Sequence, residues 1–183
     1  MPNMRFRTLI KLPDFITLTC IACGMFSIFL ASQQYFTWAA ILLIAAAISD
    51  WLDGQVAALI KRKGRFGAEL DSLADTVNFG VAPALFGYFL GLKDLFSMAI
   101  LIIFTIASVA RLARFNVAKK TTNYFIGLPT TYNSYALAFL YFIIILTNLS
   151  WNFAKWIYLA FYLISSILML SNLKILKVKG LKK

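Results

Sequence analysis

Four aspartates are the side chains in this sequence best suited to chemistry. Asp50 and Asp53 are three residues apart, and Asp71 and Asp75 are four apart. On a helix, either spacing places the two carboxylates of a pair on one face. Carboxylates can bind divalent cations or accept a proton as general bases. Histidine is absent, which excludes a Ser-His-Asp triad, a histidine base and histidine-containing zinc sites.

The composition indicates what kind of element must position these aspartates. Of 183 residues, 61% are hydrophobic and 16% are aromatic, whereas a soluble domain has roughly 45–50% apolar residues. Each apolar stretch is long enough to cross a hydrocarbon layer of about 30 Å as a helix. We therefore predict an all-α integral membrane protein with a single domain, residues 1–183. Its six transmembrane helices are expected at residues 15–32, 35–60, 67–91, 95–114, 130–148 and 153–172.

The basic residues indicate how these helices are oriented. The net charge is +11, and 15 of the 18 Lys and Arg residues fall in segments that six crossings place on one face. Because Lys and Arg accumulate on the cytoplasmic side of short loops, we expect both termini in the cytoplasm. The same pattern explains the basic residues without a nucleic-acid partner. The N-terminal stretch "MRFRTLIKL" predicts a short amphipathic segment on the lipid surface.

Ionised aspartates inside a membrane need compensation, since each costs about 2.5–3.5 kcal/mol near a helix centre. We expect the second and third spans to form an antiparallel hairpin centred on Gly64, which sets Asp53 beside Asp75. By the same register, Ala57 lies beside Asp71. Carboxylates without histidine suit two Mg²⁺ or Mn²⁺ ions. Two alternatives stay open: ion pairs between the aspartates and the basic loop, or a pathway for transported cations.

Small side chains at helical spacings mark places of close approach. Gly54 and Ala57 remove bulk beside the aspartates, and a nucleotide would fit in that gap. The C-x-x-C at residues 20–23 lies inside an apolar helix, which indicates two small buried thiols rather than a redox pair. Gly87 and Gly91 have a spacing that is typical of close helix packing and that also suggests a homodimer.

The stretch from Asp50 to Asp75 resembles a known family signature. It reads D-x-x-D-G-x-x-A-A-x8-G-x3-D-x3-D, which is similar to the D-x-x-D-G-x-x-A-R-x8-G-x3-D-x3-D of CDP-alcohol phosphatidyltransferases. Ala58 stands where that family usually has arginine. Within the family, "FGAELDSLADTVNFGVAP", "RLARFN" and "FIGLP" resemble the phosphatidylserine synthase branch. The chain departs from that branch in "TTYNS" after Pro129 and in Asn78, where serine is common.

The resemblance implies an activity and a role for each motif residue. It implies transfer of a phosphatidyl group from CDP-diacylglycerol to L-serine, giving phosphatidylserine and CMP, in a prokaryotic plasma membrane with the active site facing the cytoplasm. The four aspartates would bind two metal ions, and Asp75 would act as the general base. Alternatives are another acceptor, such as glycerol phosphate or inositol phosphate, an archaeal lipid donor, or a divalent-cation transporter. The residues expected to contact the nucleotide are Asp53, Gly54, Ala57, Gly67 and Asp71.

Polar residues outside the motif are further candidates for binding substrate or phosphate. Arg111 and Arg114 are one turn apart at the cytoplasmic end of the fourth span. They are suited to a phosphate or to the serine carboxylate, although arginines at this depth also extend to the interface without a ligand. The deeper position of Arg111 favours a functional role. The full set of these candidates is Thr17, Asn78, Arg111 and Arg114.

Overall fold

The protein folds into a bundle of membrane-length helices. The computed structural model describes residues 12–59, 65–117 and 124–176. Within these ranges the helices are α2 (Leu12–Ser32), α3 (Phe36–Leu59), α4 (Arg65–Asp75), the π-helical η1 (Thr76–Val81), α5 (Ala82–Leu90), α6 (Leu95–Val117), α7 (Thr130–Leu146) and α8 (Trp151–Leu170). Because α4, η1 and α5 follow one another without a break, they form one rod. The described ranges therefore contain the six helical rods that the sequence predicts.

The lengths and surfaces of these helices are those of an integral membrane protein. Five of the rods are long and apolar enough to cross a membrane, and α7 is an apolar helix of 17 residues. Large apolar side chains face outward, including Phe26, Trp38 and Phe139, each at least 60% exposed. Such side chains are stable on the outside only against lipid or another apolar surface. The predicted amphipathic segment lies outside the described residues.

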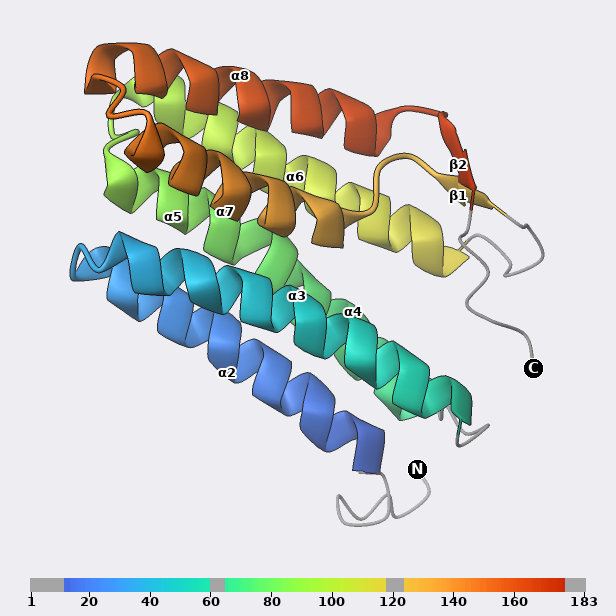
Figure 1. Ribbon diagram of the computed structural model, residues 1–183. Helices are drawn as coiled ribbons and strands as arrows, with labels where there is room; N and C mark the ends of the chain where they lie inside the picture. The colour runs from blue at the N-terminus through green and yellow to red at the C-terminus, as the bar shows by residue number, and fades with distance from the viewer. Residues whose placement is uncertain (1–11, 60–64, 118–123, 177–183) are drawn as a thin grey trace.

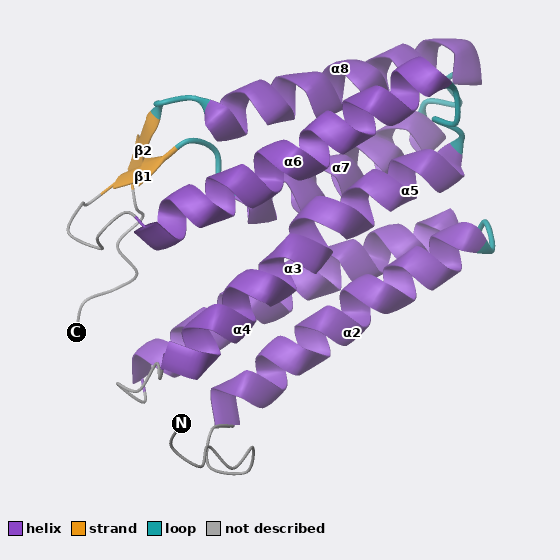
Figure 2. Cartoon of the chain, turned by 180° about the vertical axis from the view of Figure 1, so that it is seen from behind, coloured by secondary structure: helices purple, strands orange, loops and turns teal. Residues whose placement is uncertain are grey.

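One end of the bundle gathers segments that are distant in the sequence. The start of α2, the ends of α3 and α6 and the start of α4 all lie there (Figure 1). A short antiparallel ribbon lies at the same end, formed by β1 (Tyr124–Ile126) and β2 (Lys174–Leu176). It is visible from both sides of the molecule (Figure 2). We call this end the acidic end, because the aspartates described below lie near it.

The α2–α3 pair is held together by small residues and by two similar hydrogen bonds. Ser27 Oγ donates to the carbonyl of Ala39 at 2.8 Å. Seven residues earlier, Cys20 Sγ donates to the carbonyl of Ala46 at 3.1 Å. The four residues are buried, and small residues allow two helix backbones to approach closely in a membrane. The two bonds follow the same antiparallel register and fix α2 against α3. Neither cysteine forms a disulfide; Cys20 is buried, as predicted, whereas Cys23 is half-buried.

The third rod is interrupted by a π-helical turn at η1. Pro83 lies in the first turn of α5 and has no amide hydrogen for the helical ladder. Just before it, the amide of Ala82 donates to the carbonyl of Val77, five residues back. The carbonyl of Pro83 itself accepts a hydrogen bond from the Tyr162 hydroxyl at 2.7 Å. The π-helical turn changes which side chains the rod turns inward after Asp75.

The Gly87 and Gly91 spacing serves packing inside the chain. A Cβ at Gly87 would come within 2.6 Å of the Tyr162 hydroxyl oxygen. A Cβ at Gly91 would come within 2.6 Å of the Trp151 ring, and Gly91 has a φ of 135°, which favours glycine. Both glycines are therefore required by α8 of the same chain. Their spacing gives no support to the homodimer that it suggested.

Candidate metal centre

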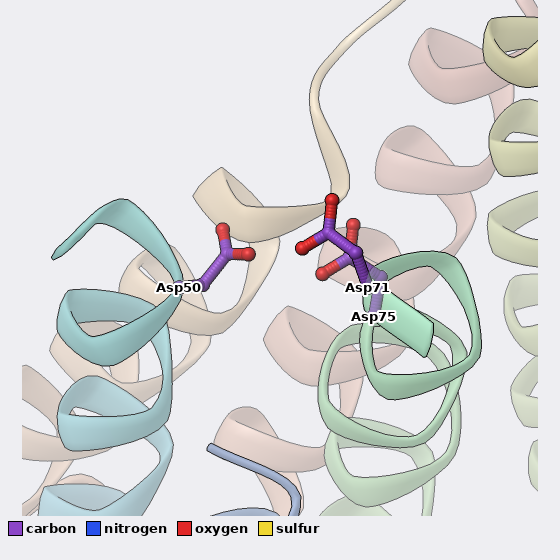
Figure 3. Close-up of side chains that lie close together, drawn as sticks. All are labelled: Asp50, Asp71 and Asp75. Carbon is purple, nitrogen blue, oxygen red and sulfur yellow. The ribbon is translucent and has the colours of Figure 1, made fainter. Parts of the chain in front are cut away.

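Three of the four motif aspartates converge at one place. Asp50 comes from α3, whereas Asp71 and Asp75 come from α4, and their carboxylates point toward a shared space (Figure 3). One carboxylate oxygen from each of the three residues lies within 4.8 Å of the other two. All three side chains are half-buried. The spacing of Asp71 and Asp75 explains why these two lie together, since residues four apart on a helix share one face.

The predicted hairpin is placed in part. The prediction set Asp53 beside Asp75 and Ala57 beside Asp71, but the side chains of Asp53 and Ala57 lie outside the described residues. The structure brings Asp50, from the same predicted acidic face as Asp53, together with Asp71 and Asp75. The two acidic faces thus meet through these three aspartates.

Two of the predicted nucleotide contacts cannot be placed. Asp53 and Ala57 belong to α3, but their side chains lie outside the described residues. Gly54 is exposed, and a Cβ there would meet no atom within 4 Å. Gly67 instead lies against α2, where a Cβ would come within 2.6 Å of Asp14 Oδ1. Gly54 thus borders open space, whereas Gly67 allows α2 and α4 to approach.

The donor set fits a divalent cation. Three carboxylates this close repel one another, and a bound cation would offset that repulsion. Their oxygens come from two separate helices and are near enough to share one bound ion. Oxygen ligands without histidine favour Mg²⁺, Mn²⁺ or Ca²⁺ over zinc. The geometry of Asp50, Asp71 and Asp75 is therefore consistent with a divalent-metal site.

A residue outside the predicted set, Thr131, holds the Asp50 carboxylate by a hydrogen bond. Thr131 lies in the first turn of α7, and its Oγ1 donates to Asp50 Oδ2 at 3.3 Å. The preceding Pro129 has extended backbone angles, so the chain turns into α7 directly after it. Gly127, with a φ of 76°, makes the turn before that. The "GLP" sequence was a visible turn signal, but only the fold shows that the turn delivers Thr131 to Asp50.

The two candidate arginines lie in different surroundings. Arg111 is only 6% exposed and lies within electrostatic reach of Asp75. Its Nε is buried and has no hydrogen-bond partner among the described residues. Arg114 instead reaches the C-terminal end of α8, where Nη2 donates to the carbonyls of Met169 and Ser171, each at 3.0 Å. Arg111 is thus buried near Asp75, whereas Arg114 caps a helix.

The remaining two candidates are buried against α2 or within it. Asn78 is completely buried, and its Nδ2 donates to Cys20 Sγ at 2.9 Å. Thr17 is 5% exposed and lies on α2, one turn before Cys20. The structure therefore brings Asn78 into contact with the helix that packs beside the aspartates. The residue that Asn78 contacts is Cys20, for which the sequence predicted no role.

With this geometry in place, comparison with known proteins identifies the class. Residues 10–171 match the CDP-alcohol phosphatidyltransferase family, so the chain belongs to it. It is a phospholipid-synthesising transferase with membrane helices, and the family implies CDP-diacylglycerol as the donor. The three converging aspartates belong to the motif that resembles the signature of this family. The resemblance noted in the sequence is thereby confirmed.

Individual relatives narrow the likeness further. The chain is 37% identical to a CDP-diacylglycerol–serine O-phosphatidyltransferase of Helicobacter pylori, over 98% of this chain and 77% of that protein. It is 33% identical to the protein of the same name from Mycobacterium leprae, over 91% of this chain and 58% of that protein. It is also 31% identical to an archaetidylserine synthase of Methanothermobacter thermautotrophicus, over 99% of this chain and 76% of that protein.

Proposed function

We propose that this protein transfers the phosphatidyl group of CDP-diacylglycerol to the hydroxyl of L-serine, producing phosphatidylserine and CMP. The observation that carries the proposal is the convergence of Asp50, Asp71 and Asp75 in a member of this family. The names of the relatives support serine as the acceptor, since bacterial and archaeal relatives alike are named as serine-lipid synthases.

The metal-binding part of the proposal rests on the carboxylates. Asp50, Asp71 and Asp75, together with Asp53, would hold two Mg²⁺ or Mn²⁺ ions. When bound, such ions neutralise the diphosphate of the donor and make CMP a better leaving group. The open space beside Gly54 would admit the nucleotide next to these carboxylates. Thr131 keeps the Asp50 carboxylate oriented by donating to it.

Asp75 is the group proposed to move the proton. It is the motif aspartate nearest η1, and Arg111 lies within its electrostatic reach. Asp75 would accept the proton of the serine hydroxyl as the hydroxyl oxygen forms a bond to phosphorus. The bond between that phosphorus and the bridging oxygen breaks, and CMP leaves with its electron pair. A positioned general base of this kind contributes about 10²–10⁴-fold to the rate.

Arg111 is the group proposed to bind the acceptor. A buried guanidinium is costly to leave without hydrogen bonds, and Arg111 Nε has no such partner among the described residues. A carboxylate is the natural partner for the planar guanidinium group. With the serine carboxylate held by Arg111, the serine hydroxyl would be directed toward Asp75. Glycerol phosphate or inositol phosphate would offer a phosphate to the same group, so Arg111 alone does not select serine.

The acidic end is proposed to face the cytoplasm. Helix α2 begins at this end, α3 and α6 end there, and the β1–β2 ribbon lies there (Figure 1). Most of the Lys and Arg residues lie in the sequence stretches next to these bounds. The positive-inside rule then orients the bundle. Serine and CMP are soluble in the cytoplasm, while the acyl chains of the donor and product stay in lipid.

A direct assay of the acceptor tests the proposal. Purified full-length protein in detergent receives CDP-diacylglycerol, Mn²⁺ and one alcohol at a time: L-serine, glycerol phosphate or inositol phosphate. We expect CMP release to be fastest with serine. Faster CMP release with glycerol phosphate or inositol phosphate would overturn serine as the acceptor and leave the family chemistry intact. Repeating the assay with an archaeal CDP-linked ether lipid distinguishes the two donor classes.

A further inference from the structure

A third helix packs against both of the helices that carry the metal-site aspartates. Helix α2 packs closely along α3 and also against α4 and η1. Among the described residues, α3 and α4 make few close backbone approaches to each other, and α3 meets the third rod at η1 and α5 instead. In Figure 1, α2 and α3 lie side by side and the third rod crosses behind them. The separation of Asp50 from Asp71 and Asp75 therefore depends in part on how α2 joins the two helices.

One side chain of α2 bonds to both of the other helices at this level. Cys20 Sγ donates to the carbonyl of Ala46 on α3 at 3.1 Å and accepts from Nδ2 of Asn78 on η1 at 2.9 Å. A thiol can serve as donor and acceptor at once. Cys20 is 2% exposed and Asn78 is completely buried. We call Cys20, Ala46 and Asn78 the thiol clamp.

The clamp is connected to the aspartates by one helical turn on each side. Ala46 precedes Asp50 by four residues, so in an α-helix its carbonyl also accepts the hydrogen bond of the Asp50 amide. Asn78 follows Asp75 by three residues in the same rod. A movement of either end of the clamp therefore shifts the backbone that carries a carboxylate.

The Asn78 side chain has little freedom to move away from Cys20. A Cβ at Gly24, one turn after Cys20 on α2, would overlap the Oδ1 and crowd the Cγ of Asn78. On the other side of η1, Ser134 Oγ of α7 lies 3.5 Å from the Asn78 carbonyl and donates to it. The lack of a side chain at Gly24 thus creates the slot in which Asn78 meets the thiol.

We propose that the thiol clamp is a positioning device that sets the spacing between Asp50 and the Asp71–Asp75 pair, and thereby the affinity for divalent cations. Cys20 is a positioning residue in this scheme and touches neither substrate nor metal. The inference rests on the proposed metal site. It gives a function to a cysteine whose sequence pattern suggested only a buried thiol.

Manganese binding by the purified full-length protein tests the clamp directly. Mn²⁺ is titrated in detergent and followed by electron paramagnetic resonance, without substrates. Cys20→Ala removes both hydrogen bonds and should weaken Mn²⁺ binding about tenfold, as is common when groups supporting metal ligands are lost. Cys20→Ser keeps a donor and an acceptor and should restore most of the affinity. In activity assays, Cys20→Ala should raise the Mn²⁺ concentration for half-maximal rate and leave the KM for serine unchanged.

The chain offers a matched control in the other hydrogen bond between α2 and α3. Ser27 donates to Ala39 at 2.8 Å, as Cys20 does to Ala46, but at the far end of the pair. Ser27→Ala should lower thermal stability and leave Mn²⁺ affinity unchanged. Equal weakening by Ser27→Ala and Cys20→Ala would overturn the clamp, since it would show only a general loosening of α2.

The remaining outcomes separate the clamp from the metal site. Wild-type Mn²⁺ binding in Cys20→Ala, with binding lost in Asp71→Asn, would overturn the clamp alone. Wild-type binding in Asp71→Asn would overturn the metal site and the clamp with it. If Cys20→Ala does not fold, Gly24→Ala tests the same contact, because the added methyl group displaces the Asn78 side chain while Cys20 stays in place. Folded Gly24→Ala should also bind Mn²⁺ more weakly, and unchanged affinity there would overturn the clamp.

Discussion

Asp94 and the three converging aspartates lie in surroundings that treat negative charge in opposite ways. Asp94 precedes α6 and is fully engaged by neighbours: Lys155 Nζ lies 2.7 Å from Oδ1, and the Ser97 hydroxyl donates to the same oxygen at 2.8 Å. The Ser97 amide donates to Oδ2 at 3.2 Å, which is an N-cap contact. At the acidic end, by contrast, three carboxylates turn toward one another.

The neighbours of an aspartate distinguish a structural role from a ligand-binding one. At Asp94 a cation and two donors come from residues of the fold itself, and the result is a capped helix tied to α8. At the acidic end, convergence of like charges is unfavourable in itself, so a fold that produces it is suited to a cation supplied from outside. The predictions below test this contrast.

The largest expected effect separates Asp75 from Asp94. Asp75→Asn removes the proposed base and one metal-site carboxylate while keeping the shape of the side chain, and should reduce CMP release by about 10³-fold. Asp94→Asn, the same chemical change at the opposite end, should leave the rate near that of the wild type. Single-turnover CMP release in detergent measures both. A similar loss of CMP release in both variants would show that the converging aspartates do not differ in function from Asp94.

A second prediction concerns Arg111, which the fold places near Asp75. Arg111→Gln should raise the KM for serine about 10- to 100-fold, the effect of losing a charged hydrogen bond worth about 1.5–3 kcal/mol. The KM for CDP-diacylglycerol should change much less. If instead the donor KM rises and the serine KM does not, Arg111 binds the phosphates of the donor.

A third prediction uses Arg114 as the counterpart of Arg111. Arg114→Gln removes donors to the last carbonyls of α8 and should lower the free energy of unfolding by about 1–3 kcal/mol. The KM for serine should stay near the wild-type value. Thermal unfolding and steady-state kinetics of the same preparation separate the two arginines. A large rise in the KM for serine with unchanged stability would show that Arg114 binds substrate and does not mainly cap α8.

The sequence was sufficient for the helices and for part of the site. The apolar runs predicted the rods because a membrane helix must be apolar over most of its length, and the i, i+4 spacing put Asp71 and Asp75 on one face. The shared site of Asp50 with both followed from the two facing acidic helices and from the family resemblance, and the structure brings the three carboxylates together. The contact from Thr131 to Asp50 was not predicted, because it depends on how the distant helix α7 packs.

The features that the sequence missed all depend on a distant partner. Arg114 and Arg111 look alike in "RLARFN", and only the end of α8 distinguishes them. The ribbon joins Tyr124–Ile126 to Lys174–Leu176, about fifty residues apart, and each strand is too short to be seen in a pattern of alternating residues. Likewise, nothing in the sequence around Cys20 indicates that Asn78 will lie against it.

The smallest expected effect is the pH dependence of the Asp94 pair. The hydrogen bond from Lys155, with those from Ser97, holds the pKa of Asp94 well below its usual range. A carboxyl whose pKa is lower in the folded state contributes stability above its unfolded pKa, about 3.9, and loses it as the pH falls through the folded pKa. The difference in melting temperature between wild type and Asp94→Asn should therefore be constant near neutral pH and shrink below about pH 4.

Salt provides the control for this last prediction, because the pair is exposed. Screening weakens an exposed ion pair, so 1 M NaCl should reduce the same difference at pH 7. Lys155→Gln should remove most of the dependence on pH and salt from the opposite side of the pair. A difference that stays constant down to pH 3 would mean that Asp94 acts only as a cap, through an acceptor that asparagine also provides. The contrast between Asp94 and the acidic end would then not depend on the charge of Asp94. It would depend on whether a carboxylate contacts residues of the fold or other carboxylates.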